Sequence, residues 1–131
     1  MKNKLVLKGK VKSGKGHFSW VMKNISGLWD LYKQKSGLTI FPGTLNVELA
    51  EDFSIPQNSK RIEASEYGGT VSVSFCECEI EKIKGLIIRT DKNESGKGDH
   101  PKTIIEIAAE ENLRKELNLE DGDEVQILVE M

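Results

Sequence analysis

The sequence predicts one small domain built mainly of β-strands, arranged as a mostly antiparallel or mixed barrel. The chain has 131 residues, which is the length of about one domain. About six or seven segments either alternate apolar with polar side chains or run short and apolar, as strands do. The gaps between most of them are too short for the helical crossovers of a doubly wound parallel sheet. We therefore expect residues 1–131 to fold as a single barrel domain with two short helices.

The pattern near the N-terminus predicts a strand, a loop and a helix. Residues 5–12 alternate apolar and lysine side chains almost throughout, which predicts a strand with one buried face. Residues 13–16 are small and flexible and predict a loop. Residues 26–36 carry apolar side chains at helical spacing, with Ser26 as the N-cap and Gly37 as the stop. This segment is the first expected helix.

Strands dominate the middle of the chain. Residues 44–49 alternate directly after a Pro-Gly turn, and residues 61–64 form a short strand candidate. Residues 70–81 predict a long strand whose apolar positions change from odd to even numbers at Cys76. A β-bulge produces such a change of face, so we expect one there. Residues 86–89 predict a further strand.

The last third of the chain predicts a loop, two strands and the second helix. Residues 91–100 are rich in Gly, Lys and acids and predict a loop. Residues 103–108 predict a nearly continuous apolar strand. Residues 110–117 predict a short helix, and a turn over 121–123 leads into the last strand, over 124–129.

Charge and apolar patterning exclude several classes of protein. Charged residues make up 31% of the chain, but the 19 basic and 21 acidic residues nearly balance. Wholesale disorder and a general nucleic-acid-coating role are therefore not expected. The apolar runs are too short to span a bilayer, and the N-terminus lacks the unbroken apolar stretch of a signal peptide. We expect a cytoplasmic protein without nucleic-acid or membrane partners, either a monomer or a small homo-oligomer.

The two cysteines lie two positions apart in a predicted strand. Cys76 and Cys78 therefore share a face, which is compatible with joint metal binding. A closed zinc site needs four ligands, however, and no second Cys or His pair lies nearby in the sequence. We expect both cysteines to be reduced and structural, in keeping with a reducing compartment.

The first strand and the loop after it form a basic, glycine-rich segment. Residues 1–24 hold seven Lys and no acid. This charge attracts phosphates, although lysines on an exposed strand also block edge pairing. The closely spaced glycines of residues 13–16 let backbone N–H groups approach an anion, although a plain hairpin turn explains them as well.

Two oxygen-bearing side chains follow the Pro-Gly turn. Thr44 and Asn46 lie two positions apart at the start of a strand, so they face the same way. A hydroxyl and an amide carbonyl are hard ligands that suit a Mg²⁺ whose remaining ligands are waters and substrate phosphates. The alternative is a pair of polar side chains that face solvent.

Glu106 and residues 111–114 complete the candidate positions. Glu106 interrupts an apolar strand, where a carboxylate is costly to bury unless it is paired. It either lies on an exposed face or accepts a proton or hydrogen bond from a ligand. Residues 111–114 open a helix, where Arg114 has the chemistry to bind phosphate or base oxygens; a capped surface helix is the alternative.

The order of these motifs carries more information than any one of them. In sequence, residues 9–16, 41–47, 100–108, 113–114 and 121–125 resemble the corresponding motifs of the CTP-dependent riboflavin kinases. The resemblance runs from about Leu5 to Val129. Its most specific parts are the Pro-Gly-Thr-Leu-Asn block and the series Glu-Ile-Ala, Leu-Arg and Asp-Gly-Asp.

The resemblance implies a fold and an activity. Members of the family fold as a six-stranded cradle-loop β-barrel, also called RIFT-like, and transfer the γ-phosphoryl group of CTP to the 5′-hydroxyl of riboflavin. The products are FMN and CDP, and Mg²⁺ is the implied cofactor. A non-catalytic barrel that binds a flavin or a cytidine nucleotide remains the alternative.

The resemblance also implies roles for individual residues. Thr44 and Asn46 would hold Mg²⁺, and Glu106 would contact the ribityl end of the flavin near the accepting hydroxyl, as the catalytic carboxylate. The implied nucleotide-binding residues are Gly14, Lys15, Gly16, His17, Phe18, Ser19, Glu111, Asn112, Leu113 and Arg114.

The sequence departs from the family pattern at two places. Its Gly-rich loop is shorter than in many members. Gly98 stands where the family often has a flavin-contacting Thr, eight residues before Glu106. By this correspondence, Gly98 is the predicted flavin-contact position. We expect no DNA-binding winged-helix extension before the barrel.

Overall fold

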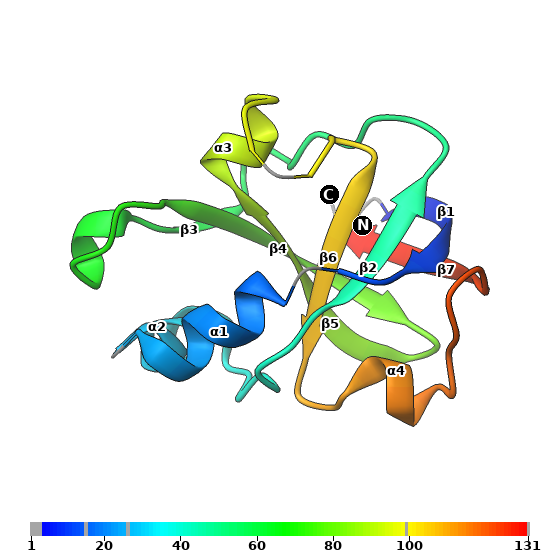
Figure 1. Cartoon of the computed structure of the whole chain (residues 1–131), viewed down its shortest axis with the longest axis horizontal. Helices are drawn as coiled ribbons and strands as arrows, with labels where there is room; N and C mark the ends of the chain where they lie inside the picture. Colours follow the sequence, from blue (N-terminus) through cyan, green and yellow to red (C-terminus); the bar gives the residue numbers. More distant parts are fainter. Residues whose placement is uncertain (1–3, 15, 26, 99, 131) are drawn as a thin grey trace.

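Six strands close into an antiparallel barrel in the computed structural model of the chain (Figure 1). The structure describes residues 4–14, 16–25, 27–98 and 100–130. Its strands are β1 (Lys4–Lys12), β2 (Leu45–Leu49), β3 (Lys60–Ile62), β4 (Val73–Ile80), β5 (Ile83–Thr90), β6 (Ile104–Ala109) and β7 (Glu124–Glu130). The barrel order is β4-β5-β6-β2-β1-β7, and β7 pairs with β4 to close it. The prediction of a mainly β, six-stranded barrel is confirmed.

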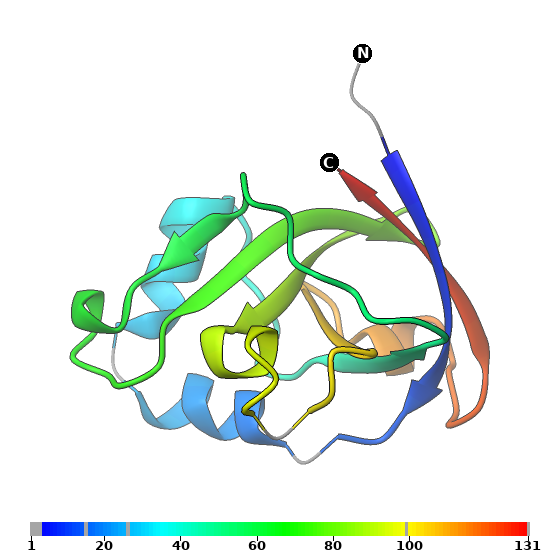
Figure 2. The ribbon, with the colours of Figure 1, turned by 90° about the horizontal axis from the view of Figure 1, so that it is seen from above.

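Short helices pack around the barrel on more than one side (Figure 1). They are α1 (His17–Asn24), α2 (Leu28–Ser36), α3 (Asp91–Glu94) and α4 (Leu113–Glu116), with a 3-10 turn over Ala64–Glu66. Figures 1 and 2 show α1 and α2 on the same side of the molecule as β3, which pairs with β4 beyond the barrel. The predicted helices match α2 and α4. The structure adds α3 within residues 91–100, which were expected to form a loop, and α1 in a segment for which no element was predicted. Ser26, the predicted N-cap of α2, lies outside the described residues; the observed N-cap is Gly27.

Two apolar clusters hold the molecule together, one inside the barrel and one outside it. The inner cluster includes Val47, Ile105, Ile107 and Ile127. The outer cluster lies between the sheet and the helices; it includes Met22, Leu28, Tyr32, Phe75, Ile88 and Ala108. Burial of these side chains is the main contribution to stability, at about 1.5–3 kcal/mol for each fully buried large aliphatic residue.

Strand β4 contributes to both clusters, and this corrects the predicted bulge. Val73 and Phe75 face the outer cluster, whereas Cys76, Cys78 and Ile80 face the barrel interior. From Val73 to Ile80, β4 pairs residue for residue with β5, without an inserted position. The apolar face therefore changes because the strand passes from one core to the other, and the bulge prediction is wrong.

The cysteines are core residues, as predicted. Cys76 and Cys78 are free thiols buried in the barrel cluster. Burial raises the pKa of Cys76 to about 12 and also raises that of Cys78, so both thiols stay protonated at neutral pH.

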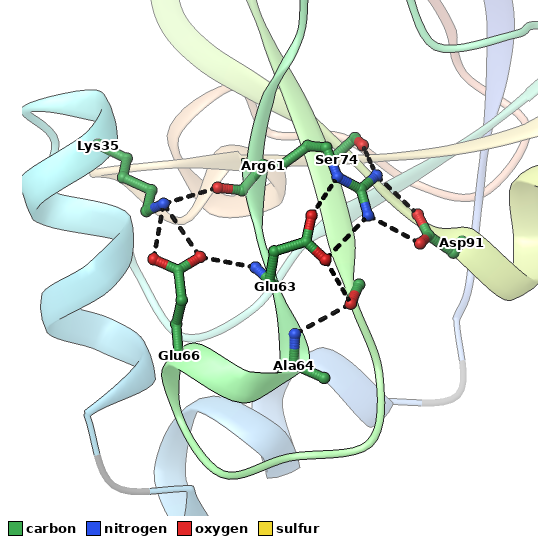
Figure 3. Close-up of polar contacts among 8 residues, drawn as sticks. Lys35, Arg61, Glu63, Ala64, Glu66, Ser74 and Asp91 are labelled. Carbon is green, nitrogen blue, oxygen red and sulfur yellow. Dashed lines mark hydrogen bonds and ion pairs between the residues drawn. The ribbon is translucent and has the colours of Figure 1, made fainter.

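An ion-pair network fastens β3 to its neighbours (Figure 3). The Arg61 guanidinium donates to both oxygens of Asp91, at 3.0 and 2.9 Å, and to Glu63 at 2.7 Å. Lys35 of α2 pairs with Glu66 at 2.9 Å and donates to the Arg61 carbonyl oxygen at 2.8 Å. The network thus joins α2, β3 and α3 at the edge of the outer cluster.

Helices in the described parts of the chain lack the length and apolar character that crossing a bilayer requires.

Candidate active site

One cavity of about 430 Å³ gathers residues from four separate parts of the sequence. These parts are the end of β1 with the following loop and α1, the segment entering β2 and its start, β6, and α4. The lining residues are Lys12, Ser13, Gly14, Gly16, Phe18, Ser19, Gly43, Thr44, Asn46, Glu106 and Arg114. Most of the predicted site residues are thus brought together here, although they are far apart along the chain.

The strand register explains this convergence. Lys12 of β1 lies opposite Asn46 of β2, which in turn lies opposite Glu106 of β6. Residues directly opposite one another share a face of the sheet. Because their neighbours Val47 and Ile105 fill the barrel interior, these three side chains point to the outside, where the cavity lies.

Thr44 and Glu106 are joined directly. The Thr44 hydroxyl donates to Glu106 Oε1 at 3.1 Å, and both side chains are partly buried. The carboxylate is therefore held at the edge of the cavity rather than in the barrel core. This hydrogen bond holds the Glu106 carboxylate close to Asn46, so a ligand in the cavity would meet both side chains.

Arg89 fixes the segment that leads into β6. Its guanidinium is 2% exposed and forms an ion pair with Glu94 at 2.9 Å. Burial lowers the pKa of Arg89, and the charge of Glu94 opposes that shift. The guanidinium also donates to three backbone carbonyl oxygens, those of Phe53 at 2.7 Å, Lys102 at 3.3 Å and Ile104 at 3.4 Å. This buried cation fixes the start of β6 against β5, and with it the position of Glu106.

Asn46 presents a buried oxygen that has no hydrogen-bond partner among the described residues. The residue is 8% exposed, and its Oδ1 accepts no hydrogen bond within the described ranges. Such an atom is unfavourable unless a ligand or ion satisfies it. An amide oxygen next to a threonine hydroxyl suits a hard divalent cation, so the residues present fit Mg²⁺.

The glycine loop packs directly on this amide. A Cβ at Gly14 would collide with the Asn46 side-chain amide, so a larger residue there would displace Asn46 from its position in the cavity. Gly16 has φ +74° and is the N-cap of α1, and its carbonyl oxygen accepts from Trp20 N at 3.1 Å. Phe18 and Ser19 then line the cavity from α1. Lys15 lies outside the described residues, and for His17 only the backbone is described.

Asp121 connects the loop to α4, a role that sequence reasoning missed. Its two carboxylate oxygens accept from Ser13 Oγ at 2.7 Å and from Arg114 Nη2 at 2.8 Å. These two hydrogen bonds hold the pKa of Asp121 below its usual range. The sequence signal was the Asp-Gly-Asp turn, interpreted there only as a turn and a family motif.

A second cavity of about 360 Å³ continues the first toward α4. Ser19, Gly43, Thr44 and Arg114 line both cavities. Asn112 and Leu113 line the second one; Asn112 also caps α4, and Leu113 is anchored in the barrel core. The two cavities together form an elongated site.

Two predicted positions are not brought to these cavities. Glu111 is exposed and lies outside both linings. Gly98 packs in its own loop, where a Cβ would lie 1.7 Å from Asn93 Oδ1, and it too lies outside both linings. Their assigned ligand contacts stay predictions.

A larger recess, of about 650 Å³, lies elsewhere on the barrel between β1, β2 and β7. Its lining mixes lysine and glutamate side chains and includes none of the predicted site residues. Size alone therefore does not select the site; the converging polar groups do.

Comparison with known proteins identifies the family. The model of the family CTP-dep_RFKase, described as a domain of unknown function, DUF120, matches residues 11–129. The chain belongs to this CTP-dependent riboflavin kinase family. The resemblance drawn from the motif order is thus confirmed.

Individual relatives agree with this assignment. The chain is 34% identical over 128 residues to a riboflavin kinase of Methanocella arvoryzae and 33% identical over 136 residues to one of Methanospirillum hungatei. These alignments cover 95% of the chain but 57% and 58% of the relatives, so the chain spans little more than half their length. A riboflavin kinase of Staphylothermus marinus is 32% identical over 127 residues, covering 94% of the chain and 90% of the relative.

Proposed function

We propose that the protein is a CTP-dependent riboflavin kinase, which transfers the γ-phosphoryl group of CTP to the 5′-hydroxyl of riboflavin and yields FMN and CDP. The observation that carries this proposal is the single cavity shared by the glycine loop, Thr44, Asn46, Glu106 and Arg114. Phosphoryl transfer requires charge neutralisation and in-line positioning, with little covalent help from the protein. The residues of this cavity include groups suited to neutralise phosphate charge and a carboxylate suited to position the accepting hydroxyl.

The nucleotide is assigned to the elongated site formed by both cavities. Gly14, Gly16 and Lys12 line the first cavity, and their backbone amides and the lysine charge are the groups assigned to neutralise the phosphates. Arg114, fixed by Asp121, lies at the junction of the two cavities, with Asn112 beyond it. A triphosphate over the loop and a nucleoside near α4 is the arrangement that these groups favour.

Thr44 and Asn46 are the residues assigned to Mg²⁺. When bound, the ion neutralises charge on the phosphate oxygens during transfer. The Oδ1 of Asn46 supports the assignment, since it is buried in this cavity and has no hydrogen-bond partner within the described ranges.

Glu106 is assigned to the accepting hydroxyl. Its carboxylate is held by Thr44 at the cavity edge. Glu106 lies directly across the sheet from Asn46, which in turn lies across from Lys12. From there it orients the 5′-hydroxyl and accepts its proton as the new P–O bond forms.

Incubation of the protein with riboflavin, Mg²⁺ and either CTP or ATP, followed by chromatography of the flavins, tests the proposal. We expect FMN with CTP. Absence of FMN with both nucleotides would contradict the kinase, and tight flavin or cytidine-nucleotide binding without turnover would favour the non-catalytic barrel. FMN with ATP alone would remove the CTP assignment.

A further inference from the structure

The second cavity combines apolar residues of the barrel core with a few polar groups. Leu45, Ile107 and Leu113 line it and belong to the inner cluster. Its polar lining side chains are those of Ser19, Lys23, Thr44, Asn112 and Arg114. A recess that is largely apolar, with a small number of polar groups, is typical of a site for a flat organic ring.

Phe41 presents an aromatic ring to this cavity. The side chain is 37% exposed and lines the cavity, although the backbone around it is fixed. Phe41 N donates to the Ala109 carbonyl oxygen at 2.7 Å, and Gly43 N donates to the Phe41 carbonyl oxygen at 2.8 Å. The Trp29 indole N–H donates to the Ile40 carbonyl oxygen at 2.8 Å and so anchors the preceding residue. The ring is therefore held in place while remaining open to a ligand.

Gly43 places that ring next to the point where the two cavities meet. A Cβ built on Gly43 would lie 3.2 Å from Phe41 Cε1, so the ring edge lies close to the Gly43 backbone. Gly43 lines both cavities, whereas Phe41 lines only the second of the two. A nucleotide whose phosphates occupy the first cavity therefore brings its next groups toward the Phe41 ring.

Lys23 adds a positive charge to the same cavity. It lies one helical turn after Ser19 in α1; Ser19 lines both cavities, whereas Lys23 lines only the second of the two. Lys23 is exposed, and an ammonium has three donors and no acceptor. It therefore favours a ligand group that accepts hydrogen bonds, such as a carbonyl oxygen, over an amine.

We propose, resting on the function proposed above, that the second cavity holds the base of the donor nucleotide, stacked on Phe41, and that Lys23 favours a base with a ring carbonyl. Every base has a π-face that stacks on an aromatic side chain, so Phe41 supplies affinity without selecting the base. Cytosine offers a carbonyl oxygen to a donor, whereas adenine carries an exocyclic amine and no carbonyl. Lys23 thus supplies the preference for a pyrimidine nucleotide.

The competing role for Lys23 is contact with a phosphate. Phosphates are common to CDP, ADP and inorganic tripolyphosphate, so a phosphate contact affects the binding of all three. A contact with the base carbonyl affects CDP alone. Calorimetric titration of the full chain with these three compounds therefore separates the two roles, and a thermal melt of each variant checks that it is folded.

The stacking role is tested by Phe41→Leu, with Phe41→Tyr as the variant that keeps an aromatic ring. We expect Phe41→Leu to raise the Kd for CDP about 10-fold, because base–ring stacking is lost. Phe41→Tyr should bind CDP as the wild type does, and tripolyphosphate binding should be unchanged in both. The control is Trp20→Leu, which removes a more exposed aromatic side chain that lines neither cavity, and it should leave CDP binding unchanged.

The selecting role is tested by Lys23→Met, which keeps most of the side chain and removes its charge. We expect the Kd for CDP to rise about 5- to 10-fold, the loss of one hydrogen bond from a charged donor, while the Kd values for ADP and tripolyphosphate do not rise. The control is Lys33→Met, which removes the same charge from an exposed position of α2 and should change none of the three.

The outcomes separate this inference from the kinase. If the wild type makes FMN from CTP but Phe41→Leu binds CDP as tightly as the wild type, or no more weakly than Trp20→Leu, the base subsite is wrong and the kinase stands. If Lys23→Met weakens the binding of all three compounds equally, Lys23 contacts phosphate and does not select the base. If the wild type binds CDP but makes no FMN, the kinase is overturned, and the expected losses in the variants still support the base subsite. If the wild type does neither, both fail together.

Discussion

At the scale of single residues, the cavity depends on two polar side chains that stand out among apolar neighbours. Asn46 buries a carbonyl oxygen that has no partner within the described ranges, and this arrangement costs free energy in the unliganded protein. Glu106 places a carboxylate in an otherwise apolar strand, where it accepts a hydrogen bond from Thr44. A polar atom that is unfavourable for folding yet lies in a cavity is typical of a binding site.

We expect Asn46→Ala to lower turnover about 10- to 100-fold at limiting Mg²⁺, because it removes one of the two proposed metal ligands. The melting temperature should stay the same or rise, since the deleted oxygen is unsatisfied. Kinetics over a Mg²⁺ titration and thermal unfolding measure both effects, with the exposed Asn58→Ala as control. Full activity of Asn46→Ala at limiting Mg²⁺ would remove the metal assignment.

We expect Glu106→Gln to reduce kcat about 100- to 1,000-fold with little change in CTP affinity, because it removes a proton acceptor at the proposed acceptor end. The amide oxygen of Gln still accepts from Thr44, so the local geometry is kept. Steady-state kinetics and calorimetric titration with CTP separate the two quantities. A loss of CTP affinity as large as the loss of kcat would place Glu106 in the nucleotide subsite instead.

At the scale of elements, the site is assembled by contacts that fasten loops to the barrel. Gly122 N donates to the Val11 carbonyl oxygen at 2.8 Å, and Val11 N donates to that of Asp123 at 2.8 Å. These bonds hold the turn before β7 against the end of β1. Asp121 then reaches Ser13 and Arg114 from a fixed position.

We expect Asp121→Ala to raise the KM and Kd for CTP several-fold, because Ser13 and Arg114 both lose the acceptor that positions them. Riboflavin affinity should be unchanged. The matched control is Glu120→Ala, which deletes a negative charge from the exposed neighbouring residue. Equal effects of the two variants in calorimetric titrations would mean that charge, rather than positioning, is responsible.

Two elements illustrate where pattern reasoning stops. The helix α1 carries Phe18, Val21 and Met22 at helical spacing. Its N-cap is Gly16, which has no side chain to form a capping hydrogen bond, so the usual sequence signal for a helix start is missing. The β4–β5 hairpin turns at Glu81 and Lys82, with φ of 48° and 67°. Non-glycine residues rarely adopt such values, so a turn at Glu-Lys is not expected from the sequence. The structure therefore starts β5 earlier than predicted.

At the scale of the whole molecule, the barrel and the helical layer are joined by β4 and by the Arg61 network. Hydrogen bonds from Arg61 lower the pKa of Glu63 and Asp91, and one from Lys35 lowers that of Glu66. A carboxylate with a lowered folded-state pKa stabilises the fold above its ordinary pKa. That contribution is lost as pH falls through the folded-state value.

We therefore expect Arg61→Ala to melt a few degrees below the wild type at pH 7, with a difference that shrinks as pH falls below about 4. The effect is modest because the network is largely exposed. Thermal unfolding by circular dichroism from pH 7 to pH 3 measures it, with the exposed Lys33→Ala as control. A difference that is constant or grows toward pH 3 would contradict the prediction.

The sequence by itself determined the barrel strands, through the alternation of apolar and polar side chains, and the family, through the order of short motifs. It also singled out Thr44, Asn46 and Glu106, because a hydroxyl, an amide and a carboxylate stand out next to apolar neighbours.

Only the tertiary structure decided which of these groups meet. Thr44 and Glu106 are 62 positions apart, and their contact depends on the register between β2 and β6. The same holds for β4, which contributes side chains to both apolar clusters, and for Asp121, which connects the glycine loop to α4. Each depends on pairing and packing between distant segments, and an apolar residue looks the same in a sequence whichever core receives it.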